Sequence, residues 1–116
     1  HMNNWTAEEL TFRCEHLSVR LEKLAQKFLQ IADLNQDSTN AEVVLRMIRE
    51  SKQLLELTAI NLDVDSAFEL AQIQRQLSRW HIHWSDAWAQ DSGYLEISKL
   101  AQSWGFRIRE MVGVLV

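Results

Sequence analysis

The hydrophobic residues of this chain recur at alternating steps of four and three positions, the spacing of one stripe along an α-helix. The longest row consists of Leu10, Cys14, Leu17, Leu21, Leu24, Phe28 and Ile31. Three more rows consist of Val44, Ile48 and Leu55; of Leu70, Ile73, Leu77, Trp80 and Trp84; and of Ile97, Ala101, Trp104, Ile108, Met111 and Leu115. Because each stripe must be buried against other helices, the pattern predicts an all-α protein with four helices.

Capping boxes mark three helix starts, since a serine or threonine hydroxyl and a glutamate three residues later satisfy free N–H groups there. The three boxes are Thr6 with Glu9, Thr39 with Glu42, and Ser66 with Glu69. The polar segments 33–40, 63–66 and 91–93 are the predicted turns, so three helices end near Ala32, Asn61 and Gln90. Turns this short favour antiparallel neighbours. We expect one antiparallel up-down-up-down four-helix bundle over residues 1–116, with residues 1–2 typical of a cloning remnant.

Charge and composition exclude several classes of partner. The chain has 116 residues and a formal net charge of −4, with alternating signs, which argues against binding to nucleic-acid phosphates. No window is basic enough for an anionic membrane surface, and the longest apolar run, Met111–Val116, is too short to span a bilayer. Cys14 is the only cysteine and lies in the first stripe, where it fits as a small core residue. A reducing, cytoplasmic location is therefore expected.

The sequence contains no pattern typical of a catalytic or metal site. His81 and His83 are two residues apart, so on a helix they diverge by roughly 200° and cannot bind one ion. The Glu-x-x-His motif of di-iron bundles is absent, and one cysteine cannot form a haem attachment motif. Asp63 and Asp65 lack the rest of a calcium loop and are better placed to cap a helix. We therefore predict no catalytic residue, no cofactor and no metal, and hence not an enzyme.

Tryptophan is concentrated in the second half of the chain. Trp80, Trp84 and Trp88 follow one another at steps of four on the third predicted helix, and Trp104 lies on the fourth. The simpler interpretation is that these large rings fill the core of the bundle. The alternative is a pocket lined by the four rings that encloses a planar or lipid-like ligand.

A second row of apolar residues lies opposite the core stripes. Its members are Trp5, Phe12, Val19, Phe68, Ile82 and Phe106. Since contiguous apolar patches on a surface usually mark interfaces, these six residues are the predicted protein interface. If Phe12 and Val19 face outward, two copies of the first helix could pair about a twofold axis, which predicts a homodimer.

The proline-free helices and the leucine- and glutamine-rich texture, as in Leu70-Ala-Gln-Ile-Gln-Arg-Gln-Leu77-Ser-Arg-Trp80, resemble those of small cyanobacterial regulators. The PatD-type factor of heterocyst development, which acts on the tubulin-like division protein, is the family of this kind that the chain resembles. The resemblance implies a regulator of cell division or differentiation. The leading hypothesis is a non-enzymatic, cytoplasmic helical adaptor. The alternatives are the ligand-binding bundle and a subunit domain of a larger assembly, cut at its apolar end Val112–Val116.

Overall fold

The computed structural model describes residues 6–85 and 93–115, and within them all regular structure is helical. The α-helices are α1 (Ala7–Cys14), α2 (Leu17–Leu34), α3 (Ala41–Ala59), α4 (Val64–Ile82) and α6 (Gly93–Leu115), and a short 3₁₀ helix η1 (Ser38–Asn40) precedes α3. The prediction of an all-α protein is confirmed. The number of helices differs from the prediction, because these ranges are five α-helices and not four.

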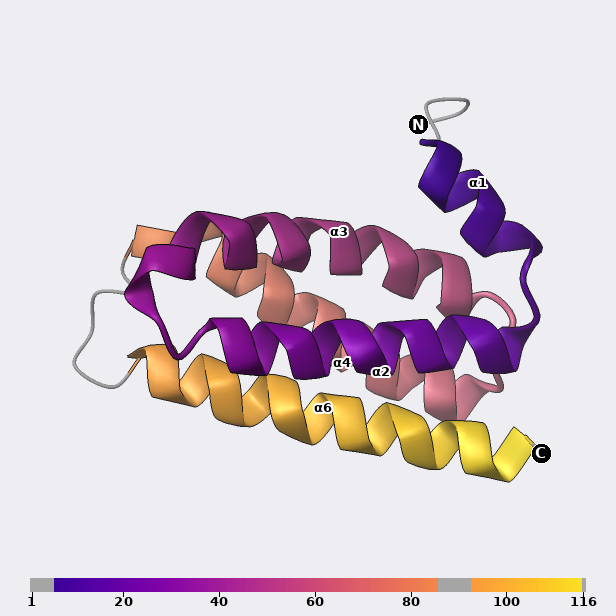
Figure 1. The fold of residues 1–116 in the computed structure, drawn as a ribbon. Coiled ribbons are helices and arrows are strands. Elements are labelled where there is room, and N and C mark those ends of the chain that lie inside the picture. Colours follow the sequence, from indigo (N-terminus) through magenta and orange to yellow (C-terminus); the bar gives the residue numbers. More distant parts are fainter. Residues whose placement is uncertain (1–5, 86–92, 116) are drawn as a thin grey trace.

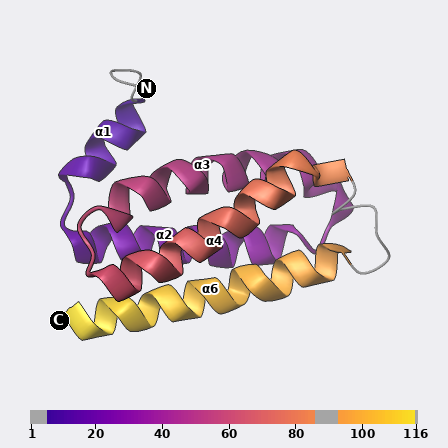
Figure 2. The same ribbon diagram turned by 180° about the vertical axis from the view of Figure 1, so that it is seen from behind.

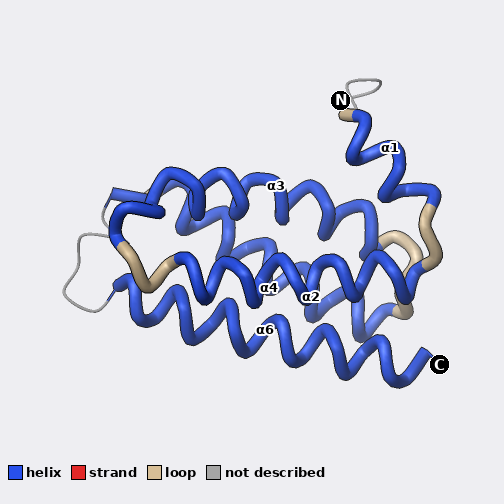
Figure 3. Tube along the Cα trace, in the orientation of Figure 1, coloured by secondary structure: helices blue, strands red, loops and turns tan. Residues whose placement is uncertain are grey.

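The four long helices α2, α3, α4 and α6 lie together, and each runs opposite to the one before it (Figures 1 and 2). The most extensive packing is between α2 and α6, and α3 packs against both α2 and α4. The fifth helix, α1, is short, stands at an angle to α2 and packs against α3 (Figure 3). Residues 6–85 and 93–115 therefore form one α-helix more than the simple bundle that the sequence predicted.

The predicted first helix is interrupted. Glu15 and His16 have extended backbone angles, with φ −80° and ψ 154° at Glu15 and φ −60° and ψ 151° at His16. The break turns α1 so that Phe12 faces the protein interior and is only 3% exposed, while Leu10 is 48% exposed and Cys14 is also exposed. The predictions for these three residues were therefore wrong. The physical reason is that α1 folds back toward α3. Burying the large Phe12 ring there removes more apolar surface from water than burying Leu10 would.

From Leu17 to Met111 the predicted stripes do face the core. The fully buried members include Leu21, Phe28, Ile48, Leu77 and Ile108. Leu17, Trp84 and Trp104 are partly buried and pack against the same cluster. Beside its predicted stripe, α3 also buries Met47, Leu54 and Leu57, because it packs against α2, α4 and α1.

One of the three predicted capping boxes is correct. The Thr6 hydroxyl accepts from the Glu9 N–H at 3.1 Å, and the Glu9 carboxylate accepts from the Thr6 N–H at 2.9 Å. The Thr39 box was wrong, because the Asp37 carboxylate accepts from the Thr39 N–H at 2.9 Å and caps η1 instead.

The Ser66 box was also wrong, because α4 begins three residues earlier than predicted. Asp63 is the N-cap of α4, and its carboxylate accepts from the Ser66 N–H at 3.1 Å. Hydrogen bonds from the Ser66 hydroxyl and N–H lower the pKa of Asp63. The expectation that Asp63 caps a helix is confirmed, and Glu69 is left available for a contact with α6.

Two buried polar residues, which we call the polar anchors, join the ends of α2 to other helices. At the start of α2, Arg20 donates from Nη1 to the Leu57 carbonyl at 2.5 Å and to Oδ1 of Asn61 at 2.9 Å, at the C-terminal end of α3. Just after α2, Asn35 donates to the Tyr94 carbonyl at 2.6 Å at the start of α6. Arg20 donates to a carbonyl in the last turn of α3, where backbone oxygens lack partners within the helix, and Asn35 ties the end of α2 to the start of α6.

Gly105 and Gly113, the two glycines in the interior of α6, should respond differently to alanine. A Cβ atom added to Gly113 would have no neighbouring atom within 4 Å. Gly113→Ala should therefore stabilise the protein by about 0.5–1 kcal/mol, because alanine has the higher helix propensity. A Cβ on Gly105 would lie 2.7 Å from Leu29 and 3.1 Å from the Ala25 carbonyl, so Gly105→Ala should destabilise by about 1–3 kcal/mol. Thermal unfolding of both variants measures the contrast. Equal gains at both positions would show that α2 and α6 are not packed this closely.

Candidate protein-binding surface

The most distinctive surface feature is a groove between α4 and α6, which we call the α4–α6 groove. The two helices approach each other at the first turns of α4 and diverge toward its C-terminal end (Figure 2). The groove has a volume of about 400 Å³. It is lined by Phe68, Glu69, Gln72, Ile73, Gln76 and Arg79 of α4 and by Leu100, Trp104 and Arg107 of α6.

The floor of the groove is apolar and belongs to the protein core. Ile73 is buried, and Leu100 and Trp104 are partly buried against the core cluster. Phe68 forms part of the wall and is 63% exposed. A side chain of a partner protein could enter this groove and cover both the exposed ring and the apolar floor.

An ion pair fixes one end of the groove. The guanidinium of Arg107 on α6 donates from Nε and Nη2 to the two carboxylate oxygens of Glu69 on α4, at 2.8 and 2.6 Å. These hydrogen bonds lower the pKa of Glu69 and raise that of Arg107. Both groups are largely exposed, so the pair contributes little to stability, but its two-point geometry sets the spacing of the helices beside Phe68.

The outer face of α4, which we define as Val64, Phe68, Arg75, Arg79 and Ile82, continues this surface. All five side chains are exposed, and Ile82 is 74% exposed. Arg79 donates to the Gln76 amide at 2.9 Å, and neither arginine of this face makes an ion pair with a residue that the structure describes. The face therefore combines apolar side chains with positive charge, in a chain whose formal net charge is −4.

The predicted interface residues lie on several helices and do not form one surface. Phe68 and Ile82 share the outer face of α4, Phe106 is 54% exposed on α6, and Val19 is exposed on α2. Phe12 was predicted to be exposed and is buried, for the reason given above. Trp5 lies outside the described residues.

Two of the four predicted pocket tryptophans are brought together, and their rings fill the space between them. The rings of Trp80 and Trp104 have centroids 5.2 Å apart, and the ring of Phe28 lies edge-on to Trp104 with centroids 5.6 Å apart. Trp84 packs against the core, and Trp88 lies outside the described residues. Phe28 belongs to the first core stripe, but spacing along the sequence does not show that it lies beside the tryptophans. Trp104 is the member of this cluster that also lines the α4–α6 groove.

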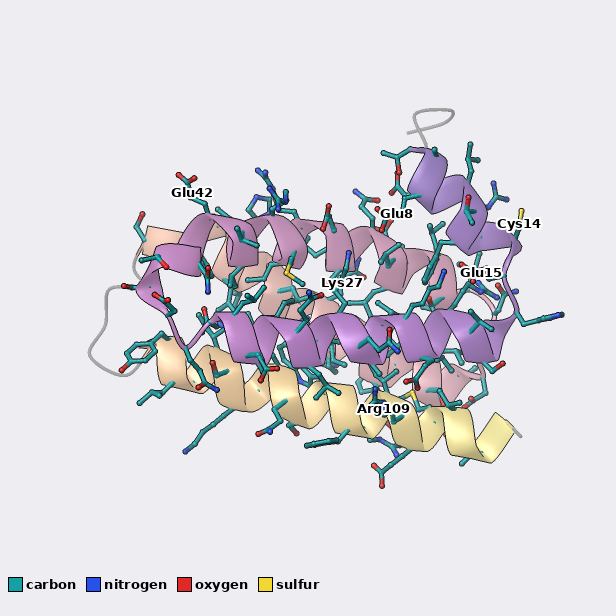
Figure 4. The ribbon with its side chains drawn as sticks, in the orientation of Figure 1. Glu8, Cys14, Glu15, Lys27, Glu42 and Arg109 are labelled. Atoms are coloured by element: carbon teal, nitrogen blue, oxygen red, sulfur yellow. The ribbon has the colours of Figure 1, made fainter. Side chains whose placement is uncertain are left out.

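A second hollow of about 540 Å³ separates α1 from α2 and is lined mainly by polar residues. Its lining includes Glu8, Phe12, Glu15 and Lys27, which lie between the two helices, and Figure 4 shows the three charged ones. Glu15 pairs with Lys23 at 2.6 Å, and Glu8 lies 3.8 Å from Lys27. This hollow lies under the appended helix α1, and these ion pairs span it.

The ionisable side chains that the structure describes include no group of three or more His, Cys, Asp or Glu residues arranged to hold a metal ion. His81 Nδ1 lies 3.3 Å from the Lys52 ammonium, and the pKa of His81 is lowered by partial burial and by the positive charges of Lys52 and Arg49. His16 and His83 are exposed. Among the helices described, none has the length and apolar character needed to cross a bilayer.

Comparison of the chain with protein-family models, with curated proteins and with solved structures found no match.

Proposed function

We propose that this chain is a non-enzymatic, cytoplasmic helical adaptor that binds an acidic amphipathic helix of a protein partner along α4 and α6. The observation that carries the proposal is the exposed Phe68 side chain beside the apolar floor of the α4–α6 groove. An amphipathic helix is a common occupant of such a groove, because its apolar face covers the floor while its polar face stays in water.

Charge favours an acidic partner. The outer face of α4 presents Arg75 and Arg79, while Arg107 at the end of the groove is already paired with Glu69. A partner helix with carboxylates beside its apolar stripe would pair with the two arginines, which would speed association and fix its orientation. We also infer that α2, α3, α4 and α6 act as an up-down-up-down four-helix frame that holds this surface, with α1 attached to it.

The resemblance to PatD-type factors suggests the first partner to test, the tubulin-like division protein, and a role in bacterial cell division or differentiation. A planar small ligand is the second candidate occupant. It is favoured by Trp104, whose indole lines the groove and contacts the tilted ring of Trp80, with ring centroids 5.2 Å apart. In that case, titration with the ligand would change tryptophan fluorescence without any protein partner.

A single charge placed in the groove wall should test the proposal. Phe68→Glu should weaken binding of the division protein, or of a designed acidic amphipathic peptide, at least about tenfold, because an unpaired carboxylate would be desolvated in an apolar contact. Helicity should not change, since Phe68 is exposed. Fluorescence anisotropy of the labelled partner measures the affinity.

Phe106→Glu is the matched control, because Phe106 is the same residue type, is also exposed and does not line the groove. It should leave the affinity unchanged, while Arg75→Glu should weaken binding in a salt-dependent way. Loss of binding with Phe106→Glu but not with Phe68→Glu would move the interface to the other side of α6 and refute the proposed site.

A further inference from the structure

The helix α1 carries apolar side chains on two opposite faces, and the folded chain uses only one of them. Phe12 is its one buried residue and faces the protein. Leu10 and Cys14 lie on the opposite face, and Figure 4 shows Cys14 directed away from the other helices. An apolar stripe left in water on a short appended helix indicates a second arrangement in which that stripe is covered.

The link between α1 and α2 permits such an arrangement. Only Glu15 and His16 depart from helical geometry, and the segment 13–18 contains neither glycine nor proline. The spacing of Leu10, Cys14 and Leu17 continues in phase across the break, so a straight helix over 7–34 would align all three with the core stripe of α2. His16, the N-cap of α2, makes no side-chain capping bond that would hold the break in place.

The contacts that hold α1 folded back include the packing of Phe12 at α3 and the ion pairs Glu15–Lys23 and Glu8–Lys27. The Phe12 contact and the Glu8–Lys27 pair could form equally well between two molecules, whereas the Glu15–Lys23 pair spans the hinge and favours the folded-back form. Exchange of an identical element between two copies needs no new docking site, because the site already fits that element within one chain. A short hinge that can become helical is the usual route to such an exchange.

We propose that α1 is an exchangeable arm that, straightened onto α2, docks through Phe12 on α3 of a second copy of this chain. The exchange is reciprocal, so each copy both gives and receives an arm. In the dimer, the straightened helices of the two copies meet along Leu10 and Cys14, which explains why α1 is apolar on both faces. This inference concerns a different surface from the α4–α6 groove and does not depend on the proposed function.

Two hinge variants shift the equilibrium in opposite directions. His16→Pro fits the folded-back form, because the φ of −60° at His16 is that of proline and Glu15 is extended, as a residue before proline must be. Proline at this position is incompatible with a continuous helix, so the variant should stay monomeric. Glu15→Ala with His16→Ala favours helix and removes the Glu15–Lys23 ion pair, so it should raise the dimer fraction about tenfold. Light scattering coupled to gel filtration, over a range of protein concentrations, measures both.

Cross-linking of a mixture of unlabelled and isotopically labelled protein distinguishes an exchanged dimer from any other dimer. Unlabelled and ¹⁵N-labelled protein are refolded together, dimers are isolated, and a carbodiimide joins neighbouring lysine and glutamate side chains. In an exchanged dimer, about half of the Glu8–Lys27 links should join one labelled and one unlabelled chain. The Glu50–Lys27 link, between α2 and α3 at 3.3 Å, is the internal control and should always join peptides of one label.

Three results would overturn the proposal. The first is a protein that stays monomeric when refolded at high concentration, and the second is a His16→Pro variant that dimerises as well as the parent. The third is a dimer whose Glu8–Lys27 links always carry one label, which would place the dimer contact elsewhere. Circular dichroism of each variant shows that its helices have formed, so that a monomer is not confused with an unfolded chain.

Discussion

Replacing Phe28 with alanine is expected to destabilise the protein by about 3–5 kcal/mol, the usual cost of removing a fully buried aromatic ring. Phe28 has no exposed surface and lies edge-on to Trp104, with ring centroids 5.6 Å apart, so both packing and an aromatic contact are lost. A domain of this size is stable by only about 5–15 kcal/mol, and the variant should therefore unfold at a much lower urea concentration.

Phe68→Ala is the matched control, because it removes the same ring from an exposed position on α4. Its effect should stay within about 0.5 kcal/mol. Tryptophan fluorescence adds a local probe, since Phe28→Ala should alter the surroundings of Trp104. If the two phenylalanine variants were equally stable, the core described between α2, α4 and α6 would be wrong.

Arg20→Ala should have the second largest effect, a loss of about 2–4 kcal/mol. The change leaves the buried Leu57 carbonyl and the less buried Asn61 amide oxygen without their donor, and it also removes the packed side-chain stem. The positive charge of Arg20 lies at the C-terminal end of α3, where the helix dipole favours it.

Arg20→Met separates these contributions, because methionine replaces the stem but not the hydrogen bonds. It should cost about 1–3 kcal/mol, whereas Arg75→Ala at an exposed position should cost almost nothing. A methionine variant more stable than the parent protein would mean that burying the guanidinium costs more than its hydrogen bonds return. Urea unfolding of all three variants provides the comparison.

The long helices were predictable because apolar spacing decides which face of a helix is buried, and this holds from Leu17 to Met111. The break at Glu15–His16 was not predictable, since the stripe continues in phase through Cys14 and Leu17 and no glycine or proline interrupts it. Tertiary contacts favour the break, among them the packing of Phe12 at α3 and the Glu15–Lys23 ion pair.

The candidate site was predictable in part. Phe68, Ile82 and Phe106 were assigned to the surface because they lie opposite the core stripes, and all three are exposed. The groove beside Phe68 could not be predicted, because it depends on the angle between α4 and α6 and not on the sequence of either helix. Whether Trp80 and Trp104 contact each other or leave a pocket between them likewise depends on the distance between α4 and α6.

The polar anchors have a consequence for how the helices are aligned along their lengths. Apolar stripes alone tolerate sliding, because a shift of one turn, about 5.4 Å, again places hydrophobic residues opposite one another. A shift of that size between α2 and α6 would take Asn35 away from the Tyr94 carbonyl, and one between α2 and α3 would take Arg20 away from the Leu57 carbonyl. Each slipped register would leave a buried polar group without a partner, so these two side chains select one axial alignment from several that the leucines would accept.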